Sequence, residues 1–228
     1  RFIEDEGHKA SIEIGGARGS FLNFKGSVWE KKGYGSMRNA TVTTIAPTGT
    51  IGIIAGVSSG IEPIFAVAFI RNVMEGTRLP EVNPEFERIA REEGFYSQEL
   101  IMKIARTGSV QGIDEVPAEI KRLFVTAFDI QPEWHVKMQA AFQKHVDNAV
   151  SKTINLPHDA TPSDVEKAYW LAYKLKCKGI TAYRYGSRLQ QVLYIGSVMG
   201  KETGRLLDYV SAEAEYCGGC ITPICASG

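Results

Sequence analysis

The sequence predicts a mostly parallel α/β fold, because two kinds of segment alternate along it. Short apolar segments rich in β-branched residues alternate along the chain with longer segments whose apolar residues recur at helical spacing. Such alternation is typical of strands that are joined by helices and run in the same direction. The composition agrees with a soluble globular protein, because 44% of the 228 residues are hydrophobic and 23% are charged.

The first part of the chain contains two expected helices and two expected strands. Residues 1–14 have the pattern of an amphipathic helix, which we expect to end at the Gly15-Gly16 pair. The β-branched segment 40–46 has the pattern of a strand covered on both faces, and residues 65–74 form a second candidate strand. Residues 83–95 begin with Asn-Pro, a helix start, and end with a helix-terminating glycine.

The second part of the chain continues the alternation. Ser97 as N-cap and Gly108 as the C-terminal residue delimit a helix over residues 97–108. Further helices are expected at 116–128, 132–148 and 161–179, and further strands at 149–157 and 179–185.

The last forty residues differ in character from the rest. From about residue 189 the sequence lacks a sustained period and becomes rich in glycine and small residues. We therefore expect two parts: a folded portion over residues 1–188 and an appended, partly mobile tail over residues 189–228.

Charge and hydropathy exclude several classes of partner. Lysine and arginine together number 26, as do aspartate and glutamate, so the formal net charge is zero. A nucleic-acid or membrane partner normally requires a basic excess, and the apolar runs are shorter than the roughly 20 residues that span a bilayer. Three of the four cysteines lie in the last twelve residues, where a large core does not need disulfides, so we expect a cytoplasmic protein. Because it begins at Arg1 rather than Met, we expect a piece of something longer.

The stretch TIAPTGTIGIIAGVSSGIEP, residues 44–63, places many glycines and hydroxyl side chains directly after an expected strand. A strand that turns into a helix there offers free backbone N–H groups and hydroxyl donors, which suit a phosphate group. Gly49 allows the backbone to approach the anion closely, while Thr48 and Thr50 add side-chain donors. The spacing matches neither the Walker nor the dinucleotide-binding pattern. A Gly- and Thr-rich turn without a ligand is the alternative interpretation.

Several blocks of sequence carry a family resemblance. They are ATVTTIAPTGTIGIIAG-x-SSGIEP, DNAVSKTINLP and CKGITAYRYGSR, which begin at residues 40, 147 and 177, together with RGSFLNFKGSVW and PEWHVKMQAAFQKHVDNAVSKT, which begin at residues 18 and 132. Across most of residues 18–188, with their order along the chain and the gaps between them, these blocks resemble the C-terminal part of the large catalytic subunit of ribonucleotide reductase. The likeness is closest to the adenosylcobalamin-dependent class II.

The resemblance implies both a fold and a reaction. The fold would be the C-terminal half of a ten-stranded α/β barrel with an extended cysteine-bearing tail. The reaction would be the reduction of ribonucleoside diphosphates to deoxyribonucleotides by a thiyl radical, with adenosylcobalamin as the cofactor that initiates it. In the family, the loop that matches APTGT binds the substrate diphosphate through backbone amides and hydroxyls. This assigns the phosphate-binding role to Ala46, Pro47, Thr48, Gly49, Thr50 and Ile51.

Three cysteines near the end of the chain are the second chemical feature. Cys220 and Cys225 look like the C-terminal Cys-x4-Cys of reductase large subunits, a catalytic dithiol shuttle that receives electrons from thioredoxin or glutaredoxin. Such a shuttle needs two thiols that can close a ring on a flexible segment. Cys217 and Cys220 form a second redox spacing, Cys-x-x-Cys, and stay a possible pair. A zinc knuckle is disfavoured, because zinc usually takes four ligands and no histidine lies nearby.

The chain also departs from the complete family. The family's radical cysteine lies in an Asn-x-Cys-x-Glu pattern, which these 228 residues lack. We therefore expect the chain to require the upstream reductase half, to be inactive alone, and to belong to a homo-oligomeric enzyme. A fragment of an iron-dependent class I large subunit is one alternative, although Arg184 separates Tyr183 from Tyr185 where that class has adjacent tyrosines. A non-catalytic, nucleotide-binding accessory chain is another, although it leaves the dithiol unexplained.

Other conspicuous residues have plainer interpretations. Cys177 lies in an expected helix and is predicted to pack rather than to react. His135 and His145 point about 80° apart around a shared helix, which makes a common metal site improbable. Residues 151–153 either line the substrate pocket or belong to the alternating pattern of a core strand.

Overall fold

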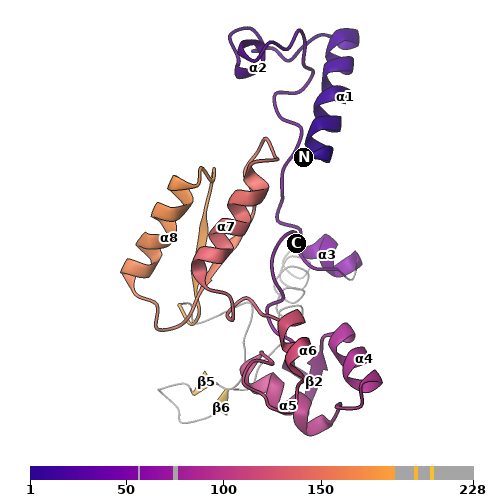
Figure 1. Cartoon of the computed structure of the whole chain (residues 1–228), viewed down its shortest axis with the longest axis vertical. Coiled ribbons are helices and arrows are strands. Elements are labelled where there is room, and N and C mark those ends of the chain that lie inside the picture. Colours follow the sequence, from indigo (N-terminus) through magenta and orange to yellow (C-terminus); the bar gives the residue numbers. More distant parts are fainter. Residues whose placement is uncertain (56, 74–76, 188–197, 200–205, 208–228) are drawn as a thin grey trace, which may run out of the picture. The chain divides into compact units, whose positions relative to one another are not determined.

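The computed structural model describes residues 1–55, 57–73, 77–187, 198–199 and 206–207 (Figure 1). The chain forms two compact units, and each is considered by itself. Unit 1 comprises residues 1–61, 132–154 and 160–183, and unit 2 comprises residues 62–131, 155–159 and 184–228. Helices and strands are both present in the described part, so the predicted α/β class is confirmed.

The first helix of unit 1 is longer than predicted. The helices of this unit are α1 (Phe2–Arg18), α2 (Val28–Lys31), α3 (Gly49–Ala55), α7 (Pro132–Gln143) and α8 (Pro162–Lys174). The prediction that the first helix ends at Gly15-Gly16 was wrong, because α1 continues through both residues. A Cβ atom on Gly15 would lie 2.8 Å from the backbone nitrogen of Arg38. This glycine therefore allows α1 to pack closely against the chain that follows it, instead of ending the helix.

The predicted strand at residues 40–46 is present only as an isolated bridge, in which Ile45 pairs with Val150 in parallel. Residues 41–46 are all half-buried or exposed, and Val42 is 39% exposed. The expectation of a strand covered on both faces was therefore wrong for the described part of the chain. The β-branched side chains favour extended backbone, but a regular strand also requires a ladder of partners.

The second half of unit 1 follows the predicted strand–helix–strand order. Strand β3 (Thr153–Leu156) pairs with β4 (Thr181–Arg184), and α8 lies between them in sequence. Thr161 begins α8 with a capping box to Asp164, whose pKa falls to about 2 because it accepts hydrogen bonds from the Thr161 amide and hydroxyl. A small apolar core joins α7, β3 and α8 through Val136, Ile154, Ala168 and Ala172.

Unit 2 begins with a hairpin that contradicts the expectation of parallel strands. Strand β1 (Ala68–Val73) pairs antiparallel with β2 (Thr77–Val82), from Ala68 opposite Val82 to Val73 opposite Thr77. The two strands are only three residues apart in sequence, which is too short for a crossover between parallel strands. The sequence interpretation missed β2 because Pro80 lies inside it, and proline usually argues against a strand.

Three helices of unit 2 build an apolar core. They are α4 (Pro84–Glu92), α5 (Gln98–Thr107) and α6 (Ala118–Leu123). The predicted caps are confirmed: Asn83 and Ser97 accept hydrogen bonds from the first turns of α4 and α5, and Gly108 ends α5 in the left-handed conformation. The buried core contains Val67, Ala68, Phe86, Ala90, Leu100, Ile101, Ile104, Ala105, Val110, Val116, Ile120 and Phe124.

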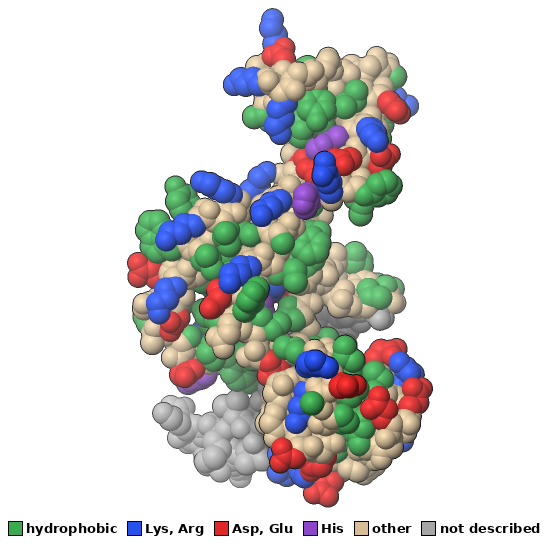
Figure 2. Space-filling view, viewed as in Figure 1, with side chains coloured by type: hydrophobic (Ala, Val, Ile, Leu, Met, Phe, Trp, Pro, Cys, Tyr) green, Lys and Arg blue, Asp and Glu red, His purple; other side chains and the backbone are tan. Residues whose placement is uncertain are grey.

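Other predictions about the fold are confirmed only in part. Helices α6, α7 and α8 all end five residues earlier than their predicted ends, so Cys177 lies after α8 and not inside a helix as predicted. The described sheets hold two strands each, including the short antiparallel pair β5 (Val198–Met199) and β6 (Leu206–Leu207), so the ten-stranded barrel stays a prediction. Across the described residues, no helix combines the length and apolar character that a membrane span requires. Basic and acidic side chains are interspersed on the face shown in Figure 2, in keeping with the zero formal charge.

Candidate functional site

The predicted phosphate loop, residues 46–51, begins directly after the Ile45 bridge and continues into the first turn of α3. Ala46 and Pro47 are exposed, Thr48 is half-buried, and Gly49 is the first residue of the helix. The Gly52 amide donates to the Thr48 carbonyl over 2.9 Å and closes the first turn. Helix geometry leaves the amides of the first residues of α3 without carbonyl partners inside the helix. The structure therefore places backbone donors and the Thr48 hydroxyl together.

Two glycines allow the chain after α3 to fold back onto this loop. Gly60 has a φ of +54°, and a Cβ atom there would lie 3.6 Å from the Ala46 carbonyl oxygen. At Gly52, a Cβ atom would lie 3.3 Å from the Val57 carbonyl, while the Val57 amide donates to the Gly52 carbonyl over 3.0 Å. The positive φ disfavours a side chain at Gly60, and a side chain at Gly52 would crowd the Val57 carbonyl.

Ser59 is a residue of this loop that the sequence interpretation did not single out. Its hydroxyl oxygen lies 3.4 Å from the Thr48 hydroxyl oxygen, and Ser59 is half-buried. The Ser-Ser-Gly sequence before the sharp turn at Gly60 was the available signal. Residues 46–60 contain no charged side chain, so every donor that they offer is neutral. Such a loop can bind an anion through hydrogen bonds without repulsion from a carboxylate of its own.

The chain that enters the loop is held by the segment after α7. The Asn148 amide donates to the Thr43 carbonyl over 3.0 Å, and the Ser151 amide donates to the Ile45 carbonyl over 2.8 Å. The Thr44 hydroxyl donates in the opposite direction, to the Ala149 carbonyl over 2.9 Å. These hydrogen bonds fix the register of the entering chain up to the residue before Ala46.

Asp147 is the polar centre of this attachment. Its Oδ2 atom accepts the amides of Val42 (2.7 Å) and Thr43 (3.3 Å), and its Oδ1 atom lies 2.9 Å from Nε2 of His8. Burial raises the pKa of the Asp147 carboxyl, but the Val42 amide and His8 outweigh it, so the pKa lies below its ordinary value. The carboxylate therefore stays ionised at neutral pH.

Asp147 also belongs to a group that could be read as a metal site. Glu4, His8 and Asp147 place one potential ligand atom each within 4.8 Å of one another. Both oxygens of Asp147 are already occupied, by His8 and by backbone amides, and Glu4 lies 3.4 Å from His145. Hydrogen bonds and ion pairs therefore account for the group without a metal ion.

The structure describes only some of the other residues that the sequence singled out. Cys217, Cys220 and Cys225 lie outside the described residues. Cys177 is half-buried against the α7–α8 core, and burial raises the pKa of its thiol, in agreement with a packing role. His135, in α7, is 1% exposed. Tyr185, which follows β4, packs edge-on against Phe128.

Residues 151–153 show the alternation of a core strand, with Lys152 buried between two half-buried neighbours. Lys152 is 3% exposed, and its ammonium donates to the Thr153 carbonyl. Both earlier interpretations of this segment, pocket lining and core alternation, remain compatible with that pattern.

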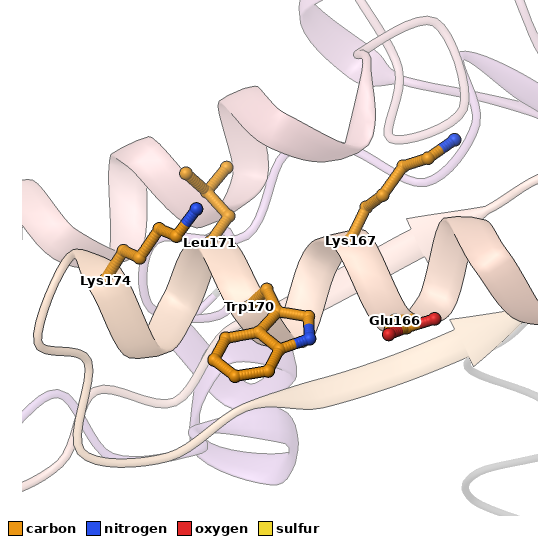
Figure 3. A pocket seen from close by; sticks show the side chains of 5 residues that line it. All are labelled: Glu166, Lys167, Trp170, Leu171 and Lys174. Carbon is orange, nitrogen blue, oxygen red and sulfur yellow. The ribbon is translucent and has the colours of Figure 1, made fainter.

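A surface depression on α8 lies apart from the loop in sequence. Glu166, Lys167, Trp170, Leu171 and Lys174 line it, and all of them project from one face of a single helix (Figure 3). Walls from one helix cannot enclose a ligand on several sides, so this depression is not the candidate site.

The sequence of the whole chain is similar to that of known proteins. The sequence profile of the family described as "Ribonucleotide reductase, barrel domain" matches residues 1–183. The chain belongs to this family. It is 54% identical over 201 residues to the vitamin B12-dependent ribonucleoside-diphosphate reductase of Thermoplasma acidophilum, covering 88% of this chain and 26% of that protein. The protein of the same name from Mycobacterium tuberculosis (strain CDC 1551 / Oshkosh) is 48% identical over 225 residues, which cover 99% of this chain and 31% of the relative.

A solved structure agrees with this family on the level of the fold. The class Id ribonucleotide reductase alpha subunit of Actinobacillus ureae superposes with a TM-score of 0.61 and 24% sequence identity, over 81% of this chain and 32% of that chain. The predicted family is thereby confirmed, and so is an α/β fold of the reductase type. The chain spans between a quarter and a third of the length of the two curated relatives.

Proposed function

We propose that this chain is the part of a ribonucleoside-diphosphate reductase that supplies the substrate-phosphate loop and a dithiol shuttle. The observation that carries the proposal is the loop itself: in a chain of this family, residues 46–51 lead uncharged donors into the start of α3. The names and the high identity of the two curated relatives support the assignment to the reductase reaction.

The loop would bind the diphosphate of a ribonucleoside diphosphate. The amides of Gly49, Thr50 and Ile51 and the hydroxyl of Thr48 would donate to phosphate oxygens, while Ala46 and Pro47 shape the turn. The contact between the hydroxyls of Thr48 and Ser59 would hold the threonine hydroxyl in one orientation. A neutral donor set fits a diphosphate whose charge is balanced partly by other portions of the enzyme.

The reaction would replace the 2′-hydroxyl of the ribose by hydrogen. The hydroxyl leaves as water, and two thiols are oxidised to one disulfide, which balances the two electrons. Adenosylcobalamin would supply the initiating radical by homolysis of its cobalt–carbon bond. The depression on α8 does not fit this cofactor, because only one helix face lines it. We therefore assign no residue of this chain to the cofactor and derive no step through it.

The shuttle and the partners complete the proposal. Cys220 and Cys225 would pass electrons from thioredoxin or glutaredoxin to the active-site disulfide, with Cys217 and Cys220 as the alternative pair. The upstream reductase half would provide the radical cysteine, because its Asn-x-Cys-x-Glu pattern is absent from these residues. The complete enzyme would be a homo-oligomer in the cytoplasm.

The proposal is tested by reduction of cytidine diphosphate with adenosylcobalamin and a dithiol. The chain is assayed alone and mixed with the upstream half from the same source. We expect activity only in the mixture, and a loss of roughly 100-fold on Thr48→Phe, because a displaced substrate reacts slowly. Thr181→Phe is the matched control, since Thr181 is an exposed residue at the start of β4.

Two other outcomes would change the conclusion. If the two halves bind each other and remain inactive, the chain is an accessory subunit that completes its partner. Activity of the chain alone would show that the radical cysteine has been placed wrongly.

A further inference from the structure

A buried glutamine on α7 connects two segments that are distant in sequence. Gln139 is 0% exposed, and its Nε2 atom donates to the Val150 carbonyl over 3.1 Å and to the Gly179 carbonyl over 2.8 Å. Val150 lies just before β3, and Gly179 lies just before β4. One side-chain amide therefore satisfies two backbone carbonyls and ties together the starts of two paired strands.

The acceptor end of the same side chain has no partner. Gln139 Oε1 is buried, and no hydrogen-bond partner exists for it among the described residues. An unpartnered buried acceptor is destabilising, and an apolar side chain of similar size would avoid this penalty. A glutamine at this position is therefore useful for the two hydrogen bonds that its Nε2 atom donates, rather than for packing alone.

The Val150 carbonyl leads directly to the phosphate loop. Val150 is the residue that pairs with Ile45, and the next amide, that of Ser151, donates to the Ile45 carbonyl over 2.8 Å. Ala46, the first residue of the loop, follows Ile45. Gln139 therefore acts on the loop through one intermediate segment, and all of these residues belong to unit 1.

A second glutamine, one helical turn further along α7, reinforces the same segment. Gln143 Nε2 donates to the Asn148 carbonyl over 2.8 Å, and its Oε1 atom accepts the Lys178 amide over 3.2 Å. Both glutamines thus bind the 148–150 segment and the 178–179 segment. The repetition at i and i+4 places both amides on one face of the helix.

We propose that Gln139 is a positioning residue for the phosphate loop, because its amide holds Val150 in the register that sets Ile45 and hence residues 46–51. It contacts no substrate itself. The phosphate-binding role of the loop rests on the function proposed above, whereas the coupling between Gln139 and the loop can be tested without any ligand.

The first test uses the unmodified chain and nuclear magnetic resonance. The side-chain amide protons of Gln139 are expected to exchange with solvent at least about tenfold more slowly than those of Gln111. Gln111 also donates to a carbonyl over 2.8 Å, but it is exposed and belongs to unit 2. Equal exchange rates would overturn the proposal without any variant.

The second test replaces the amide and follows hydrogen exchange by mass spectrometry. Gln139→Met keeps the size of the side chain and removes both donors. We expect peptides 43–52 and 146–152 to exchange about tenfold faster, while the α8 peptide 162–174 changes little. Gln111→Met is the matched control and should leave these peptides unchanged. Uniform acceleration of all peptides of unit 1 would mean that Gln139 only stabilises the core.

The third test asks whether the chemistry of the donor matters. In Gln139→Glu the ionised carboxylate cannot donate, but burial raises the pKa of a carboxyl and acidification restores one donor. Protection of peptide 43–52 should therefore recover in part at pH 5 relative to pH 7.5, and Gln139→Met should show no such recovery. No recovery in the glutamate variant would contradict the proposed donor role.

The consequence for catalysis is read in the mixture with the upstream half. Gln139→Met is expected to raise KM for cytidine diphosphate at least about fivefold, with a smaller change in kcat. If the unmodified mixture is inactive, the proposed function fails while the exchange results still decide the role of Gln139. If KM is unchanged in an active mixture, the positioning role is wrong.

Discussion

The core of unit 2 and the phosphate-loop region of unit 1 are stabilised in different ways. In unit 2, α4 to α6 and the hairpin bury a continuous apolar cluster, and the rings of Phe95 and Phe124 pack edge-on against Phe86 there. In unit 1, hydrogen bonds from Asp147 and from the segment that follows it hold an entering chain that is largely exposed. Apolar burial stabilises the first region, while directional polar contacts set the register of the second.

The two kinds of contact suit the two regions to different tasks. Apolar contacts are not directional, so they do not by themselves fix where a backbone amide points. A loop that must present amides to an anion requires its backbone in one place, and hydrogen bonds with defined geometry provide that. Polar positioning in unit 1 therefore suits a binding loop, and substitutions in the two units should differ in their effects.

The largest effect is expected from Phe86→Ala in unit 2. Phe86 is fully buried and touches the rings of Phe95 and Phe124, so its removal leaves a cavity. We expect a loss of about 3–5 kcal/mol in the free energy of unfolding, measured by urea denaturation. The same substitution at Phe2, which is 75% exposed in α1, should change little. Comparable losses at both positions would refute the contrast between a closed core and an exposed surface.

An intermediate effect is expected from Asp147→Asn in unit 1. The substitution removes the charge that pairs with His8 and weakens the acceptor for the Val42 amide. We expect a loss of roughly 1–3 kcal/mol in the free energy of unfolding at pH 7. Asp159→Asn, at an exposed position, should have almost no effect.

The pH dependence of this loss follows from the pKa of Asp147. The folded-state pKa lies below the ordinary value of about 3.9, so the contribution is fully present above that pH. It is lost as the pH falls through the folded-state pKa, because both states then bind the proton. The stability difference between Asp147→Asn and the unmodified chain should therefore shrink below about pH 4. A difference that persists unchanged under acid conditions would exclude the carboxylate as its source.

These regions also differ in how far the sequence predicted them. The caps at Asn83, Ser97 and Gly108 were predicted because capping depends on neighbouring residues. The phosphate-binding role of residues 46–51 stays a prediction, which could be made because the glycines and hydroxyls of this stretch are contiguous in the sequence. The bond from Val42 to Asp147 spans 105 positions, and local spacing contains no trace of it. The buried contacts of Gln139 escaped prediction for the same reason.

The smallest effect on stability, with the most informative effect on assembly, is expected from Ile54→Ser in α3. Ile54 is 80% exposed, so the free energy of unfolding should change by less than about 0.5 kcal/mol. An isoleucine at such a position buries apolar area only when another surface covers it, and we expect the upstream half to be that surface. Ile54→Ser should therefore weaken association with that half at least about fivefold by calorimetric titration, while Ile54→Leu should preserve it. Equal affinities for both variants would place α3 outside the contact between the halves.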